Sequence, residues 1–90
     1  NLKKNKNIIK KKQNFSYSIK VADFYFKETA LVMKNRIKKE ISINNLLIIE
    51  LSKTKYRLLI GPFDDITSLK DSFEKMNFFN FENLEIQNNV

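Results

Sequence analysis

The sequence predicts an α+β fold whose elements follow the order strand, helix, strand, strand, helix, strand. Three observations carry this prediction. Apolar and polar residues alternate over residues 17–22, apolar residues recur at helical spacing over residues 27–40 and 66–76, and a polar turn over residues 52–55 separates two apolar runs. No wide linker interrupts these elements, so residues 15–90 are expected to form one domain.

The first strand and the first helix lie in the first half of this region. The strand is expected to present two unlike faces, one with Tyr17, Ile19 and Val21 and the other with Ser18, Lys20 and Ala22. The helix is expected over Lys27–Glu40, with an apolar stripe made of Ala30, Met33 and Ile37. Because only one stripe is apolar, the helix is expected to pack that stripe against a sheet.

A hairpin, a second helix and a last strand follow. The hairpin strands are expected over Leu46–Leu51 and Tyr56–Ile60, with a turn at Ser52–Lys55, and Gly61-Pro62 is expected to end the second strand. Asp64 or Asp65 is expected to cap the second helix, whose apolar positions are Ile66, Leu69, Phe73 and Met76. A loop rich in Phe and Asn then leads to a short strand over Leu84–Gln87.

This order of elements is that of the ferredoxin-like βαββαβ fold. The four strands are expected to form one antiparallel sheet in the order 4-1-3-2. Both helices are expected on the same face of that sheet, because each has one apolar stripe to bury. The other face of the sheet is expected to stay open.

The open face is interpreted as a binding surface. With the turn at Ser52–Lys55, Ile48 lies opposite Leu59 and Glu50 opposite Arg57, and opposite residues share a face. The open face is therefore expected to carry Leu46, Ile48, Glu50, Arg57, Leu59, Ser18, Lys20, Ala22, Glu85 and Gln87. Such a mixed apolar and polar surface is typical of binding sites. A slip of one residue would exchange the two apolar faces of the second strand, so the interpretation depends chiefly on Leu59.

The positive charge of the chain is concentrated before the folded region. The net charge is +7, and residues 1–14 contain six lysines and no acid, which predicts a basic disordered linker. The chain has no Cys and no His, which excludes disulfides, Cys/His metal sites and triads with an imidazole base. No cofactor is expected, and no apolar run is long enough to insert into a membrane.

Catalysis and nucleic-acid binding are not expected of this segment. Glycoside hydrolysis usually needs two carboxylates beside one bond, and Glu50 and Glu85 are expected on opposite edge strands. The RNA-recognition motif has the same order of elements, but it stacks bases on exposed aromatic rings. Here Tyr17 and Tyr56 are expected to face the helices. A catalytic domain, where one exists, is expected upstream of this chain.

Two strand segments have a distinctive composition. Residues 17–24 read Tyr-Ser-Ile-Lys-Val-Ala-Asp-Phe, and residues 56–63 read Tyr-Arg-Leu-Leu-Ile-Gly-Pro-Phe. They resemble two hallmarks of the SPOR (sporulation-related repeat) domain, aromatic-x-Val-Gln-Val-Gly-Ser-Phe and Tyr-Arg-Val-x-Val-Gly-Pro-Phe. The resemblance covers residues 15–87, and the second segment is the more specific of the two.

The resemblance implies a role in the bacterial cell envelope. SPOR domains bind peptidoglycan glycan strands that lack stem peptides, and they bring periplasmic proteins to the division septum. Their parent proteins include division proteins and lytic transglycosylases of the rare lipoprotein A type. This domain is accordingly expected to bind such strands without catalysis, and to be monomeric. The alternative is a protein-interaction or scaffolding domain of the envelope without affinity for glycan.

Seven residues are expected to contact the glycan. Arg57 is expected to bind a lactoyl carboxylate of muramic acid, with Lys20 as a second cation. Leu59 and Ile48 are expected to pack against the C–H groups of the sugar. The remaining three are Ser18 on the same face, Asp23 and Lys55.

Four positions depart from the family pattern. The family has Gln where this chain has Lys20, Gly where it has Ala22 and Ser where it has Asp23. Some members also have an aromatic residue in place of Lys55. An amide donates and accepts hydrogen bonds whereas an ammonium group only donates them, so the contacts at Lys20 must differ. Two structural alternatives stay open: Arg57 pairs with Glu50 across the hairpin, and Asp23 caps the first helix.

Overall fold

The computed structural model describes residues 16–81 and 83–88. The predicted linker over residues 1–14 lies outside the described residues. The strands are β1 (Tyr17–Phe24), β2 (Leu46–Ser52), β3 (Lys55–Phe63) and β4 (Glu85–Asn88). The helices are α2 (Lys27–Glu40), α3 (Ile66–Lys75) and the 3₁₀ helix η1 (Met76–Phe79).

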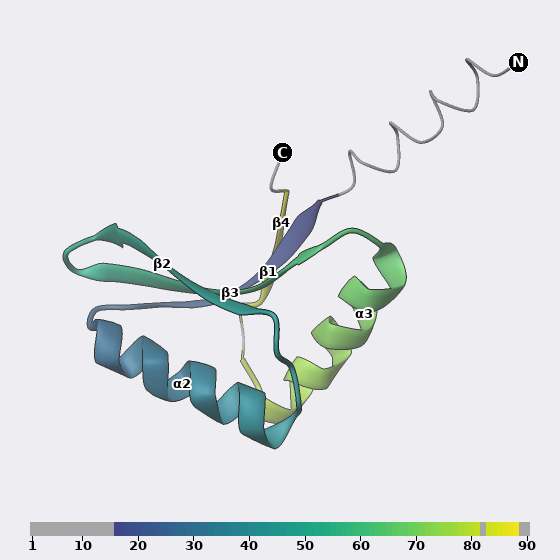
Figure 1. The fold of residues 1–90 in the computed structure, drawn as a ribbon, viewed down its shortest axis with the longest axis horizontal. Coiled ribbons are helices and arrows are strands. Elements are labelled where there is room, and N and C mark those ends of the chain that lie inside the picture. Colours follow the sequence, from purple (N-terminus) through teal and green to yellow (C-terminus); the bar gives the residue numbers. More distant parts are fainter. Residues whose placement is uncertain (1–15, 82, 89–90) are drawn as a thin grey trace, which may run out of the picture.

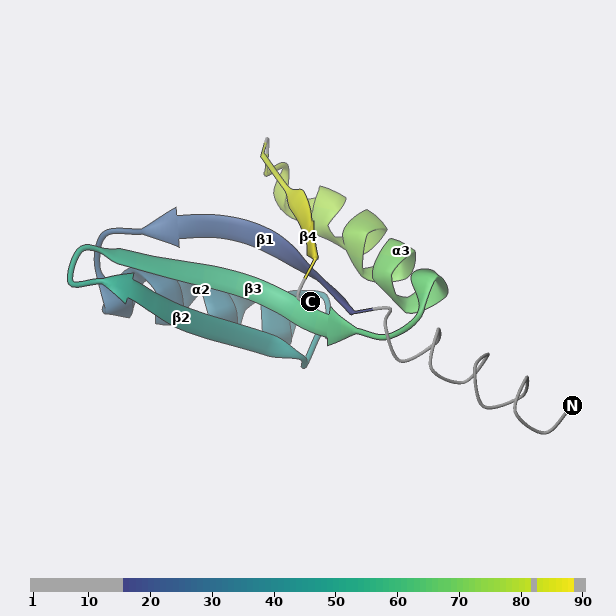
Figure 2. The ribbon, with the colours of Figure 1, turned by 90° about the horizontal axis from the view of Figure 1, so that it is seen from above.

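The four strands form one antiparallel sheet in the order β2-β3-β1-β4, which is the predicted order 4-1-3-2. Both helices cover one side of the sheet and leave the other side open, as Figure 1 shows. α2 lies under β2 and β3, and α3 lies near β1 and β4 (Figures 1 and 2). The predicted α+β, ferredoxin-like fold is therefore confirmed.

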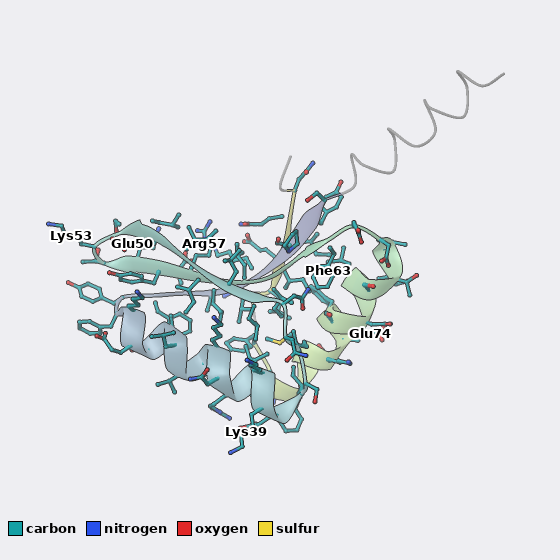
Figure 3. The ribbon with its side chains drawn as sticks, in the orientation of Figure 1. Lys39, Glu50, Lys53, Arg57, Phe63 and Glu74 are labelled. Carbon is teal, nitrogen blue, oxygen red and sulfur yellow. The ribbon has the colours of Figure 1, made fainter. Side chains whose placement is uncertain are left out.

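The core lies between the sheet and the two helices. Ile19, Leu58 and Ile60 of the sheet are fully buried there. The stripe of α2 is confirmed, since Ala30 and Ile37 are fully buried. The stripe of the second helix continues from Leu69 of α3 to Met76 of η1, but Ile66 at its start is 55% exposed and lies outside the core. Phe63 at the end of β3 fills the space beside α3 (Figure 3).

The two helices begin differently. Of the two predicted caps, Asp64 and Asp65, it is Asp65 that caps α3, because its Oδ1 accepts a hydrogen bond from the backbone N–H of Ser68 at 2.8 Å. At the start of α2 the N-cap position is occupied by Phe26, whose side chain makes no capping bond. The alternative in which Asp23 caps this helix is therefore wrong, and Asp23 belongs to β1.

The register of the β2–β3 hairpin differs from the prediction by one residue. Ile48 lies opposite Leu58, and Glu50 lies opposite Tyr56. The cause is a β-bulge between Glu50 and Ser52, close to a turn of only two residues. Both faces of this strand are apolar, so alternation alone could not determine its register.

The shift exchanges the two faces of β2. Leu46 and Ile48 turn to the helix side, where both pack with the core. Glu50 shares that side, whereas Leu47 and Ile49 turn to the open side and are 42% and 37% exposed. The predictions that placed Leu46, Ile48 and Glu50 on the open face are therefore wrong.

A second bulge changes the direction of the end of β1. Lys20 lies opposite Leu59 but Ala22 lies opposite Leu58, so Val21 is an extra residue in the ladder. Ala22 consequently packs with the core and not on the open face, which corrects its prediction. The same shift brings Asp23 to the open side, directly across from Arg57.

Gly61 and Pro62 were expected to end β3, but they lie within the strand and form a third irregularity in its ladder. The strand continues to Phe63, which pairs with Tyr17, while Ile60 pairs with Ile19. Gly61 has φ of +144° and lies against Ser18, so that a Cβ added to Gly61 would stand 2.5 Å from the Ser18 Oγ. The position therefore requires glycine both for its backbone angle and for the close approach.

Gly61→Ala is expected to lower the free energy of unfolding by about 3 kcal/mol, because it combines a strained backbone with overpacking against β1. Urea denaturation measures the change. Ser42→Ala is the control, because Ser42 also has a positive φ of 57° but is exposed and already carries a Cβ. An equal loss in both variants would contradict the crowding argument.

Candidate functional site

The polar side chains of the open side come from three adjacent strands. Lys20 of β1 lies opposite Leu59 of β3 on one flank and opposite Glu85 of β4 on the other. Two pairs further along the β1–β3 ladder, Asp23 faces Arg57. Figure 3 shows Arg57 on the side of the sheet away from the helices.

Asp23 and Arg57 form a bidentate ion pair. The Arg57 Nε donates to Oδ1 of Asp23 at 2.8 Å, and its Nη2 donates to Oδ2 at 3.0 Å. Each side chain is only 23% exposed. The alternative in which Arg57 pairs with Glu50 is therefore wrong, since Glu50 lies opposite Tyr56 on the other face. Paired in this way, the guanidinium still has three free N–H groups toward solvent or a ligand.

Lys20 extends this pair into a network of charges. Its Nζ lies 3.7 Å from Oδ2 of Asp23 and 4.0 Å from Oε1 of Glu85. The hydrogen bonds from Arg57, together with the positive charges of Arg57, Lys20 and Lys55, lower the pKa of Asp23 although partial burial opposes them. Hydrogen bonding to Asp23 in turn raises the pKa of Arg57. Asp23 is therefore held ionised at neutral pH.

Two of the predicted contact residues on this side are covered. Leu59 lies on the open side by its register and is absent from the core cluster, yet it is only 5% exposed between its neighbours on β1 and β2. Ser18 is 2% exposed and lies against Gly61. The apolar surface available on the open side instead belongs to Leu47 and Ile49, which were not among the residues expected on that face.

The remaining predicted residues divide between the two sides of the sheet. Ile48 lies on the helix side and cannot belong to a site on the open side. Lys55 begins β3, is exposed, and acts on Asp23 through its charge. The structure thus brings Lys20, Asp23 and Arg57 together, with Lys55 nearby.

A groove opens beside this cluster, at the edge of β1. β4 pairs with β1 as far as Lys20, and beyond this residue β1 has β3 as its one partner strand within residues 16–81 and 83–88. Figure 2 shows β1 running on past the short strand β4. The groove has a volume of about 480 Å³ and is lined by Lys20, Val21, Ala22, Asp23, Asn80, Phe81 and Asn83.

Three lining residues of this groove were not predicted from the sequence. Asn80, Phe81 and Asn83 come from the loop between η1 and β4, where Asn80 has a left-handed backbone with φ of 55° that ends the helix. The available signal was the composition of the loop, because amides and aromatic rings are frequent in binding sites. Its position beside β1 depends on the tertiary fold.

The arrangement is suited to binding an extended polar ligand that carries negative charge. Lys20 and the free N–H groups of Arg57 can donate to anionic oxygens, and the amides of Asn80 and Asn83 can both donate and accept. Within residues 16–81 and 83–88 there is no group of three His, Cys, Asp or Glu side chains that could hold a metal ion.

No helix in the same described stretches is long and apolar enough to cross a membrane.

Asp23→Asn is expected to lower the free energy of unfolding at neutral pH by about 1–2 kcal/mol, because a charge-assisted, partly buried pair is lost. The pKa of Asp23 is lower in the folded than in the unfolded state, so its stabilisation is complete above about pH 4 and is lost as the pH falls through the folded pKa. Urea denaturation at neutral pH and near pH 2 measures the free energy of unfolding of wild type and variant. The difference between these two free energies is expected to be smaller near pH 2.

Glu85→Gln is the matched control for this measurement. Its carboxylate is 59% exposed and lies 4.0 Å from Lys20, so the variant is expected to change stability by less than about 0.5 kcal/mol. A difference between wild type and Asp23→Asn that stays constant with pH would contradict the role given to the ion pair.

Comparisons of the chain with protein-family profiles, with curated proteins and with solved structures found no match. The resemblance of Tyr17–Phe24 and Tyr56–Phe63 to SPOR domains therefore stays a prediction. It depends on the residues of β1 and β3 and not on a detected relative.

Proposed function

We propose that this domain binds glycan strands of peptidoglycan that lack stem peptides, without catalysis, through the open side of the sheet. One observation carries the proposal. Lys20 and Asp23, two residues chosen from the sequence for this role, line a groove together with amide and aromatic side chains, and Asp23 holds Arg57 beside them.

The charge of the ligand fits the donors of this surface. Removal of the stem peptides leaves free lactoyl carboxylates on the muramic acid residues, so the strand is a repeating anion. Arg57 keeps three free N–H groups after its pairing with Asp23, and these can donate to a carboxylate or to a carbonyl. In this proposal Asp23 does not repel the ligand directly but orients the guanidinium.

The sugar rings would lie in the groove and not over Leu59 and Ile48. The groove volume of about 480 Å³ is within the usual range for ligand sites. Phe81 offers part of a ring to sugar C–H groups, and the amides of Asn80 and Asn83 match hydroxyl and N-acetyl groups. Leu47 and Ile49 add apolar surface at the other flank of the open side.

The place of action follows from the same resemblance. A domain that selects stripped glycan would carry its parent protein to the periplasmic face of the division septum, where such strands are exposed. Each exposed ion pair contributes on the order of 1 kcal/mol, so the affinity for one disaccharide is expected to be weak. Repeated contacts along one glycan strand would raise the overall affinity through avidity.

A scaffolding domain without glycan affinity is the second candidate. Lys20 and Arg57, the two cations that a glycan would need, each already lie within 4.0 Å of a carboxylate on the open side. A ligand must therefore compete with Asp23 and Glu85 for these donors. Binding to both intact and stripped peptidoglycan at the same low level would favour this candidate.

The test is retention of the full chain on purified sacculi before and after amidase removal of the stem peptides. Stripped sacculi are expected to retain the wild type more strongly. Lys20→Ala and Asn83→Ala are each expected to weaken this retention about fivefold, which corresponds to roughly 1 kcal/mol. Arg57→Lys keeps the positive charge but loses the planar guanidinium that can donate two parallel hydrogen bonds. It is expected to weaken retention to a similar degree.

Lys39→Ala is the matched control for these variants. Lys39 is an exposed lysine of α2 on the far side of the molecule from Arg57 (Figure 3). The variant removes one positive charge without touching the groove, so its retention is expected to equal that of the wild type. Equal weakening by Lys39→Ala and Lys20→Ala would show nonspecific attraction to an anionic polymer and would refute the proposed site.

A further inference from the structure

β2 is an edge strand with an apolar surface on both sides. It is seven residues long and contains Leu46-Leu47-Ile48-Ile49 followed by a single charged residue, Glu50. Among the residues that the structure describes, it pairs with β3 alone. Leu47 and Ile49 are 42% and 37% exposed on the open side. Edge strands that stay unpaired usually carry several charges, a proline or a covering loop, and this one has a bulge only near its end.

We propose that β2 pairs with β2 of a second copy of this chain, antiparallel, about a two-fold axis at Ile48. The axis follows from the regular part of the strand, Leu46–Glu50, which ends at the bulge and has Ile48 at its centre. In this register Ile48 meets itself, and Leu47 lies opposite Ile49 of the other copy. The strand is thus complementary to itself, since exposed aliphatic residues meet exposed aliphatic residues on the same face.

The charges beside the edge are complementary in the same register. Glu50 would lie opposite Leu46 of the other copy. A groove of about 300 Å³ between α2 and β2 is bordered by Leu46, Glu50 and Lys34. α2 and β2 run in opposite directions, so the second half of α2 lies under the start of β2 (Figure 1). Lys34 belongs to this second half by its position in Lys27–Glu40. Each Glu50 would therefore reach the end of the groove that carries Lys34 of the other copy.

The pairing would join two four-stranded sheets into one of eight strands. A two-fold axis perpendicular to the sheet leaves both open sides on the same side of the assembly. The clusters of Lys20, Asp23 and Arg57 in the two copies would then face one polymer together, which increases avidity for any repeating ligand. The dimer itself does not depend on that ligand, and it replaces the expectation of a monomer.

The experiment is sedimentation velocity of the full chain from micromolar to millimolar concentration, without ligand. The weight-average mass is expected to rise from the monomer mass of 10.7 kDa toward twice that value. Ile49→Lys is expected to raise the dissociation constant at least about tenfold, because it places a charge in the pairing edge. Ile49 is outside the core cluster, so the fold is expected to persist, and circular dichroism checks this.

Ile86→Lys is the matched control, since Ile86 is a 52% exposed isoleucine on the opposite edge strand, β4. It is expected to leave the dissociation constant unchanged. Glu50→Lys is expected to weaken the dimer, and the double variant Glu50→Lys with Lys34→Glu is expected to restore it. A chain that stays monomeric throughout, an unaffected Ile49→Lys variant, or a double variant no tighter than Glu50→Lys would overturn the proposal.

Discussion

The pairing of β1 with β3 at the centre of the sheet is the constraint on which the rest of the structure depends. These two strands supply most of the buried sheet residues, among them Ile19, Leu58 and Ile60, and both helices pack beneath them. The ladder brings Lys20, Asp23 and Arg57 to the same side. The close contact between Gly61 and Ser18 lies in this same ladder, so a side chain at Gly61 would disturb the core and the site together.

Irregularities in the ladders, more than the regular pairing, determine which side chains reach the open side. The extra residue at Val21 turns Asp23 toward Arg57 and turns Ala22 toward the core. The bulge after Glu50 likewise turns Leu46 and Ile48 of β2 toward the core and Leu47 and Ile49 toward the open side. Bulges commonly redirect a side chain next to a functional site, and here one of them creates the ion pair that holds Arg57 in place.

The sheet has two unlike edges. At the β4 edge the partner strand is short, and the uncovered part of β1 borders a groove with polar and charged residues. At the β2 edge the strand is long and aliphatic, with Leu47 and Ile49 exposed. A polar groove suits a hydrated ligand, whereas an apolar strand with free backbone groups suits another strand. The two edges can therefore serve different partners at the same time.

The sequence by itself determined the order of elements, the bounds of α2, a cap at Asp64 or Asp65 and the stripes that bury Ala30, Ile37 and Leu69, because these features depend on local periodicity and on neighbouring residues. It also indicated Lys20, Asp23 and Arg57. Only the tertiary structure decided which residues share a face. A bulge moves one residue across the sheet without changing composition, and an all-apolar strand such as β2 fits either register. That Asn80 and Phe81 line one groove with the edge of β1 likewise depends on the path of the whole chain.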